Sequence, residues 1–221
     1  MENKKKKIVF LGDSITQGAC ASAPEKIYHA VAAKLLGNCD AVNMGLSGTR
    51  IARQTRPSAD AACDLDYNIR AREIEGEPDC VVVFGGTNDY GHGDAPMGEF
   101  GDRTPYTFCG ACAALLGYLT DRYGKEKICV ILPLRRLSEQ NPFGEGSKKE
   151  AGAPHCEYVA ALLKAANAAG VRVLDLRGCN ELNPETAAGA ANFADGLHPN
   201  DSGPALLGEK VAEFLRAEGM A

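Results

Sequence analysis

The stretch Lys7-Ile8-Val9-Phe10-Leu11-Gly12-Asp13-Ser14 decides the fold, because four apolar residues run directly into a turn that carries polar side chains. A short apolar run bounded by turn residues is typical of a buried strand. Comparable runs recur along the chain, and apolar residues between them repeat with helical spacing. The expected strands are residues 7–13, 39–45, 79–85, 127–133 and 171–176.

Strands that alternate with helical segments predict right-handed crossovers and a parallel sheet covered by helices on both faces. The helical stripes are Ile27, Val31 and Leu35; Cys112, Leu115, Leu116 and Leu119; Val159, Leu162, Leu163 and Ala166; and Leu207, Val211, Phe214 and Leu215. We therefore expect the α/β class, as a three-layer α/β/α sandwich around a central parallel sheet of about five strands. No repeat or linker divides the 221 residues, so residues 1–221 are predicted to form a single domain.

Composition and charge exclude several classes of partner. The net charge of −5 gives no reason to expect nucleic acid or an anionic membrane as a partner. No apolar stretch approaches the ~20 residues of a membrane span. The basic run Lys4–Lys7 and the apolar residues after it are too short for a signal peptide. The sequence therefore predicts a cytoplasmic protein.

Nine cysteines are spread along a chain without an export signal, and an odd number cannot pair completely into disulfides. Reduced thiols are therefore expected. Cys109 and Cys112 form a C-x-x-C pair, for which redox chemistry and zinc binding are the functional alternatives. The pair lies in an Ala- and Leu-rich helical segment rather than directly after a strand, which favours a packing role and no metal site.

Small, polar and titratable residues follow the predicted strands, at the edge where an open α/β sheet binds its ligands. The segments are Gly12-Asp13-Ser14, Gly45-Leu46-Ser47-Gly48, Gly85-Gly86-Thr87-Asn88-Asp89, Pro133-Leu134-Arg135-Arg136 and, beyond the last strand, Asp195-Gly196-Leu197-His198-Pro199. The carboxyl edge of the sheet is therefore the predicted active site.

Ser14 lies where the first strand turns into a helix, so its hydroxyl can project from the sheet edge as a nucleophile. Amides at a helix N-terminus favour negative charge on an attacked carbonyl. The alternative role for Ser14 is a helix N-cap without catalysis. Asp13 is expected to hydrogen-bond local backbone amides.

His198 is the best candidate for a general base among four histidines, because Asp195 precedes it by three residues. On a turn this spacing brings both side chains to one side. The carboxylate can then hold the imidazole Nδ1–H and leave Nε2 free to accept the serine proton. The alternative is a helix-capping turn that happens to contain both residues.

Gly48 and Asn88 are candidate donors to a developing oxyanion, through a backbone N–H and a side-chain amide. The alternatives are a tight turn at Gly48 and an Asx-turn at Asn88. Each signal is modest alone. Four of the five segments carry these candidates, which follow one another along the chain as Ser14, Gly48, Asn88 and the Asp195–His198 pair. Together, at one sheet edge, they favour an ester hydrolase with a serine nucleophile.

These segments resemble the four blocks of the SGNH hydrolase superfamily, the GDSL-like lipases and acylhydrolases: Gly12-Asp13-Ser14, Gly48, Asn88 in Gly-Thr-Asn-Asp, and Asp195-x-x-His198-Pro. The resemblance extends from about residue 7 to residue 217. It implies a flavodoxin-like fold and hydrolysis of acyl esters without metal or cofactor. It also implies a triad of Ser14, His198 and Asp195, and an oxyanion hole of the Ser14 amide, the Gly48 amide and the Asn88 side chain. Ile15 replaces the family's Leu and Thr87 precedes Asn88, as in many members, so no functional group is lost.

Weaker candidates for substrate contacts lie near these blocks: Asp13, Thr87, Tyr90, Arg135 and Arg136. For the two arginines a solvated surface pair is the alternative. The segment 134–155, rich in Gly, Pro and charge, is predicted to be irregular and to border the pocket. His92 is also a candidate to line the pocket, whereas His29 and His155 are expected on the surface or in packing.

We therefore predict an esterase for small acyl esters, such as an acetyl group on a sugar. The chain has no Trp, and its regular apolar positions are used by the core, so no wide lipid-binding surface is apparent. The alternatives are a lysophospholipase, an acyl-thioesterase, or a non-catalytic acyl- or carbohydrate-binding relative. A flavin or nucleotide protein is disfavoured, because neither a P-loop nor a G-x-G-x-x-G motif follows the first strand. The absence of Gly-x-Ser-x-Gly argues against an ordinary α/β-hydrolase.

Overall fold

The computed structural model describes residues 5–221 and contains a sheet of five parallel strands. The strands are β1 (Lys6–Gly12), β2 (Cys39–Gly45), β3 (Cys80–Phe84), β4 (Ile128–Ile131) and β5 (Arg172–Leu174). They lie in the order β2-β1-β3-β4-β5, which is the flavodoxin-like order. The predicted parallel sheet is therefore confirmed. Lys4, the first residue of the basic run, lies outside the described residues.

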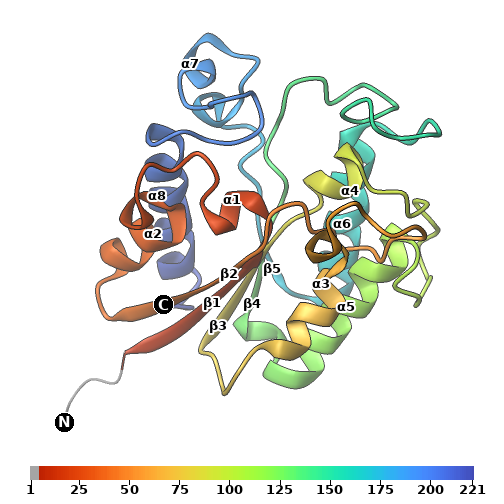
Figure 1. Ribbon diagram of the computed structural model, residues 1–221. Coiled ribbons are helices and arrows are strands. Elements are labelled where there is room, and N and C mark those ends of the chain that lie inside the picture. The colour runs from red at the N-terminus through yellow and green to blue at the C-terminus, as the bar shows by residue number, and fades with distance from the viewer. Residues whose placement is uncertain (1–4) are drawn as a thin grey trace.

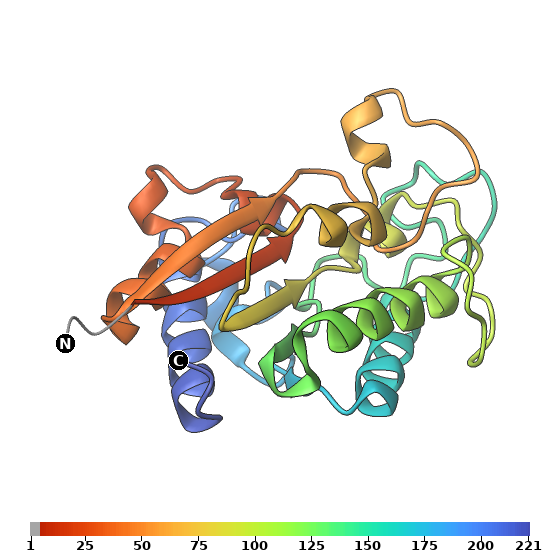
Figure 2. The same ribbon diagram turned by 90° about the horizontal axis from the view of Figure 1, so that it is seen from below.

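Helices cover both faces of this sheet (Figure 1). Helices α2 (Tyr28–Leu36) and α8 (Ser202–Ala217) pack together on one face. Helices α5 (Phe108–Tyr123) and α6 (His155–Ala169) pack together on the other. Seen from below in Figure 2, α5 and α6 run side by side and α8 lies apart from them. The predicted three-layer α/β/α arrangement is confirmed.

Two hydrophobic cores lie on the two faces of the sheet, and the side chains of β1 alternate between them. Ile8 and Phe10 belong to the core formed with α2 and α8, whereas Val9 and Leu11 belong to the core formed with α5 and α6. A strand buried on both faces needs apolar residues at every position, which explains the unbroken apolar run in the sequence. Burying side chains of this size stabilises the fold by about 1.5–3 kcal/mol each.

Strands β4 and β5 are shorter than the predicted residues 127–133 and 171–176. Pro133 has no N–H with which to extend the β4 ladder. The Asp175 carboxylate accepts a hydrogen bond from the Arg177 N–H at 2.9 Å, which begins a turn after β5. Leu132 and Leu176 are nevertheless buried. The apolar pattern therefore marked the buried residues, which continue beyond the residues that pair in the sheet.

Short helices begin at the carboxyl ends of two strands, at the upper edge of the sheet in Figure 1. Helix α1 (Ser14–Gln17) follows β1, and α4 (Thr87–Gly91) follows β3. The other short helices are α3 (Tyr67–Arg70) and α7 (Ala187–Ala190), with 3-10 turns η1 (Pro24–Lys26), η2 (Ala61–Asp64), η3 (Ala71–Glu73), η4 (Lys125–Lys127) and η5 (Asn180–Leu182). Residues 134–154 contain neither helix nor strand, as predicted.

All nine cysteines are free thiols, including Cys109 and Cys112 of the C-x-x-C pair in α5. Cys112 is fully buried, and burial raises the pKa of its thiol well above the usual value. A buried thiol of this kind packs as a small apolar side chain. Within residues 5–221, none of the helices has both the length and the apolar character needed to cross a membrane.

Candidate active site

Ser14 is positioned by a tight turn between β1 and α1. A Cβ atom on Gly12 would come within 1.9 Å of the Thr16 side chain, so the turn requires glycine. The Asp13 carboxylate accepts a hydrogen bond from the Ile15 N–H at 3.1 Å and caps α1, which is its predicted local role. Asp13 is the N-cap of α1, so the alternative that Ser14 serves as the N-cap is wrong. The Ser14 hydroxyl is therefore available for another contact.

Asp195 and His198 are held together by a turn. Asp195 Oδ1 accepts hydrogen bonds from the backbone N–H groups of Leu197, at 2.9 Å, and His198, at 2.7 Å. Its other oxygen, Oδ2, lies 2.7 Å from His198 Nδ1. Gly196 has a φ of +81°, and a Cβ atom there would come within 2.3 Å of the Leu137 side chain. Glycine is therefore required in the middle of this turn.

The turn brings the imidazole of His198 to the hydroxyl of Ser14, although the two residues are 184 positions apart in the chain. Ser14 Oγ lies 2.9 Å from His198 Nε2. An ionised carboxylate only accepts hydrogen bonds, so Nδ1 beside Asp195 carries the proton of the neutral ring. Nε2 is then the acceptor for the Ser14 O–H. A turn that served only to cap α8 would not require this contact.

The charge of Asp195 is stabilised by its surroundings. Burial tends to raise the pKa of this carboxyl, but hydrogen bonds from the His198 ring and from the His198 and Leu197 amides outweigh burial and lower the pKa. The Asp195 side chain is 52% exposed and that of His198 is 21% exposed, whereas Ser14 is buried. Asp195 therefore stays ionised near neutral pH, where it can stabilise positive charge on His198.

Asp201 ties the His198 turn to the segment that follows α1. Its carboxylate accepts hydrogen bonds from the Ser22 N–H at 2.8 Å, the Ser22 hydroxyl at 2.7 Å and the Lys26 ammonium at 2.7 Å. The bond from Lys26 and the two bonds from Ser22 lower the pKa of Asp201 to about 2. Because Ser22 follows Ser14 and Asp201 follows His198, this contact joins the two chain segments that carry the site.

The candidate oxyanion donors lie on loops that pack against each other. Within residues 5–221, the backbone N–H groups of Ser14 and Gly48 donate no hydrogen bond. Gly48 has a φ of +73°, as a tight turn requires. Its role in a turn and its role as a candidate oxyanion donor are therefore compatible, because the same residue also has a free N–H. Asn88 Nδ2 donates to the Thr49 carbonyl oxygen at 3.0 Å, a contact across 39 residues rather than the alternative Asx-turn. Its second N–H has no partner in the described chain.

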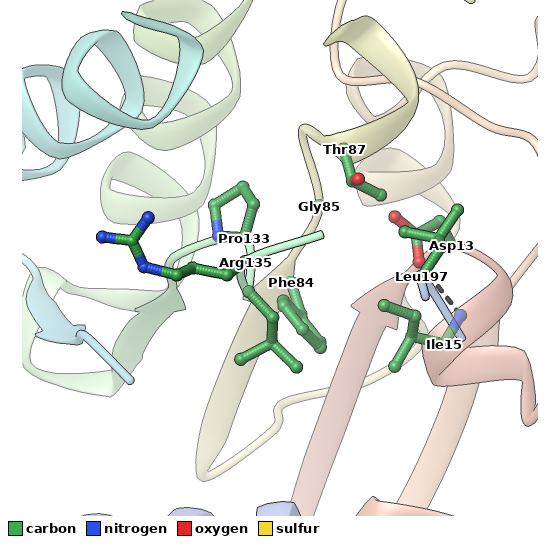
Figure 3. Close-up of a pocket in the computed structure, with 9 residues that line it drawn as sticks. Asp13, Ile15, Phe84, Gly85, Thr87, Pro133, Arg135 and Leu197 are labelled. Carbon is green, nitrogen blue, oxygen red and sulfur yellow. Dashed lines mark hydrogen bonds between the residues drawn. The ribbon is translucent and has the colours of Figure 1, made fainter. Parts of the chain in front are cut away.

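A small pocket lies beside the two chain neighbours of Ser14 (Figure 3). Asp13 and Ile15 contribute to its wall, together with Phe84, Thr87 and Leu197. Its volume is about 10 Å³, which is room for one water-sized group. Burial raises the pKa of the Asp13 carboxyl to about 6, although its hydrogen bond from Ile15 opposes the shift.

Two buried charged residues that were not predicted as site residues hold the loops of this edge in place. Arg70 donates to the Gly12 carbonyl oxygen at 2.8 Å and to the end of β2. Asp89 accepts hydrogen bonds from two backbone N–H groups of the loop after Gly48, each at 2.9 Å. Asp89 follows Asn88 directly, so its block contained a signal for this role. Arg70 belongs to α3 and to none of the motifs, so the sequence contained no signal for it.

Arg136 is buried, so the surface-pair alternative is wrong for this residue. Its guanidinium donates to Thr87 Oγ1 at 3.0 Å and pairs with Glu145 at 2.8 Å. Arg135 pairs with Glu139 at 2.6 Å, and Figure 3 shows its guanidinium directed away from Thr87. Arg136 therefore supports the wall of the small pocket through Thr87, whereas Arg135 lines the pocket itself and pairs its guanidinium with Glu139.

The remaining candidates pack the surrounding segments. The Tyr90 hydroxyl donates to the Ser138 and Asn141 carbonyl oxygens and anchors the irregular segment. His29 and His155 are buried, so they belong to packing and not to the surface. Their roles are therefore structural rather than part of the site edge.

A larger cleft of about 640 Å³ lies between residues 50–58, 92–97 and 147–153. His92 lines this cleft, as does part of the irregular segment. Ser14, Asp195 and His198 do not line it. The segment 134–155 therefore borders two hollows, through Leu134 and Arg135 at the small pocket and through residues 147–153 at the larger cleft.

Three side chains that could hold a metal ion also meet at this edge. Among residues 5–221, the one such group consists of Cys20, Asp195 and His198, whose ligand atoms lie within 4.8 Å of one another. The Asp195 and His198 atoms already hydrogen-bond each other, so a metal would compete with that contact.

Residues 10–206 match the model of the GDSL-like Lipase/Acylhydrolase family. A solved structure from Lactobacillus plantarum is 29% identical, with a TM-score of 0.79 over 97% of this chain and 98% of that one. A carbohydrate acetylesterase from Sinorhizobium meliloti is 19% identical, with a TM-score of 0.66 over 96% and 99%. A lipase/acylhydrolase from Enterococcus faecalis is 22% identical, with a TM-score of 0.61 over 96% of each chain. The last two show the fold alone, and no curated protein sequence matches.

Proposed function

Because the chain belongs to the GDSL-like lipase/acylhydrolase family and is therefore a hydrolase of ester bonds, we propose that it cleaves small acyl esters through Ser14, His198 and Asp195. Residues 1–221 form one catalytic domain in this proposal. The observation that carries it is the hydrogen-bonded path from Asp195 through His198 to Ser14, with distances of 2.7 Å and 2.9 Å. This order of carboxylate, imidazole and hydroxyl is what a serine nucleophile needs for activation.

In the proposed reaction, His198 Nε2 accepts the Ser14 proton as Ser14 Oγ attacks the ester carbonyl carbon. Asp195 remains ionised, holds the Nδ1–H and stabilises the imidazolium that forms. His198 then gives the proton to the departing alcohol, which leaves the acyl group on Ser14. A water molecule activated by the same imidazole attacks the acyl carbonyl, releases the acid and restores Ser14.

The negative oxygen of the tetrahedral intermediate requires hydrogen-bond donors that are already in place. We assign this role to the Ser14 N–H, the Gly48 N–H and the second N–H of Asn88. The free state of these three groups within residues 5–221 supports the assignment. A donor with no partner in the resting enzyme can bind the oxyanion without first breaking another bond.

The size of the small pocket favours a short acyl group. Its volume of about 10 Å³ admits a group the size of a methyl, and Ile15, Phe84 and Leu197 give it apolar walls. The methyl group of an acetyl ester fits these dimensions, which supports a short acyl group as the substrate. The fold shared with the carbohydrate acetylesterase from Sinorhizobium meliloti is consistent with an acetylated sugar as substrate.

Two measurements test the proposal. A fluorophosphonate probe followed by peptide mapping should label Ser14, and p-nitrophenyl acetate should be hydrolysed faster than the octanoate and palmitate esters. Acetylated sugars then identify the alcohol. Labelling at another residue would reject the triad. Preference for the long esters would instead favour a lysophospholipase or thioesterase, and inactivity on every ester would favour a non-catalytic binding protein.

A further inference from the structure

Cys20 lies beside the proposed catalytic residues, on the turn that follows α1. Its thiol is exposed, and the residue has a φ of +66°, a left-handed conformation that side chains other than glycine rarely adopt. Its sulfur, an Asp195 carboxylate oxygen and a His198 ring nitrogen all lie within 4.8 Å of one another. The thiol thus stands next to the Asp195–His198 pair without belonging to the proposed reaction.

The backbone around Cys20 is held on both sides. The N–H groups of Gly18 and Ala19 both donate to the Ser14 carbonyl oxygen, which closes the turn after α1. On the other side, Ser22 is bound to Asp201 through its N–H and its hydroxyl. The position of the thiol relative to His198 is therefore set by the same contacts that join Ser14 to the His198 turn.

A thiol, an imidazole and a carboxylate are three ligand types that zinc prefers. The ligand atoms of a tetrahedral zinc ion lie roughly 3.5 Å apart, so separations up to 4.8 Å can be closed by side-chain rotation. We propose that Cys20, His198 and Asp195 form an inhibitory zinc site, with water as the fourth ligand. On binding, the Cys20 thiol releases its proton to solvent and coordinates as the thiolate.

Zinc bound at this site would block the proposed reaction whichever nitrogen of His198 it takes. Coordination at Nε2 removes the acceptor for the Ser14 proton. Coordination at Nδ1 replaces the hydrogen bond to Asp195 and removes the support for the imidazolium. The inhibition therefore rests on the proposed function, whereas the binding of zinc does not.

Calorimetric titration of the metal-free protein with Zn²⁺, beside inhibition of p-nitrophenyl acetate hydrolysis, tests both parts. The variants are Cys20→Ser and, as the matched control, Cys156→Ser, which alters an exposed thiol on α6. Inhibition is expressed relative to the metal-free activity of each protein. Cys20→Ser should raise the Kd for zinc and the inhibitory concentration by at least about tenfold, because even supporting residues around a metal contribute 10–100-fold to affinity. Cys156→Ser should leave both values unchanged.

Equal zinc affinity in wild type and Cys20→Ser would overturn the site, as would the absence of binding in wild type. If a chelator abolishes activity and Zn²⁺ restores it, the ion is catalytic and the inhibitory site is rejected. Zinc binding that depends on Cys20 in a protein without esterase activity would support the site and contradict the proposed function instead.

Discussion

At the level of single residues, the division of roles among Ser14, His198 and Asp195 follows from their hydrogen bonds. One oxygen of Asp195 accepts hydrogen bonds from two backbone N–H groups, which fix the carboxylate, and the other oxygen bonds to the imidazole. The imidazole then has a single free acceptor, Nε2, and the Ser14 hydroxyl occupies it at 2.9 Å. Each residue therefore orients the next, and the three should behave as one unit in kinetics.

Ser14→Ala or His198→Ala should lower kcat by about 10⁴–10⁶, because the first change removes the nucleophile and the second removes the base that accepts its proton. The double variant should be scarcely slower than either single variant, since groups that act as a unit lose their effect together. Rates with p-nitrophenyl acetate measure this, and circular dichroism melting checks the fold. Losses that multiply in the double variant would contradict a shared step.

Asn88→Ala should lower kcat by about 10²–10³ with little change in KM, because an oxyanion donor acts on the transition state and not on the bound ester. The change also removes the 3.0 Å bond to the Thr49 carbonyl oxygen, so the melting temperature must be measured beside the rate. A rise in KM at constant kcat would assign Asn88 to substrate binding instead.

Asp13 provides a test of pH dependence. Its folded pKa is about 6 against an ordinary 3.8, so the native state holds more protons than the unfolded state between these values. Ionisation of Asp13 therefore costs free energy of folding as the pH rises through this window, by about 3 kcal/mol at most. Asp13→Asn should gain stability over wild type from pH 4 to 6 and no more above it. Urea unfolding of both proteins at a series of pH values measures the difference, which must vary with pH.

At the level of elements, the site depends on how the turn after α1 meets the turn before α8. Asp201→Ala removes the bonds to Ser22 and Lys26 but no helix cap, because Asp201 makes no side-chain cap bond to α8. We expect kcat to fall by about 10- to 100-fold with KM nearly unchanged, since small misplacements of a base have effects of this size.

The matched control for Asp201 is Glu213→Gln, which breaks the exposed ion pair with Lys210 on the same helix. Its kcat should equal that of wild type. If both variants lose activity alike, the effect belongs to the stability of α8 rather than to the contact with Ser22.

Local sequence patterns predicted the helices, the strands and the proposed triad. The interactions that produce these patterns either join residues close together in the sequence or recur at regular spacing. The run Ile8–Leu11 reports burial on both faces, and Asp195-x-x-His198 reports a contact between residues three apart. Contacts between distant segments left no such record. The bond between Ser22 and Asp201 spans 179 residues, and the bond between Arg136 and Thr87 spans 49 residues.

At the level of the whole molecule, nucleophile and base come from opposite ends of the chain and meet at the carboxyl edge of the sheet. Ser14 follows β1, which lies between β2 and β3 in the sheet. His198 precedes α8, which packs against α2 and the sheet. Activity should therefore depend on the packing of the α2 and α8 layer as directly as on the integrity of the sheet.

Leu207→Ala in α8 and Leu116→Ala in α5 compare the two layers, because both side chains are fully buried, one in each core. Each variant should lose about 2–5 kcal/mol of unfolding free energy through the cavity it creates. Since both layers bury the same strands, activity and helical ellipticity should disappear at the same urea concentration in wild type and in both variants. The contrary outcome is that Leu207→Ala, but not Leu116→Ala, loses activity at a lower urea concentration than it loses helical ellipticity. The α8 layer would then be detaching from an intact sheet. In that case the position of the His198 turn would depend on the packing of α8 more than on the turn's own hydrogen bonds.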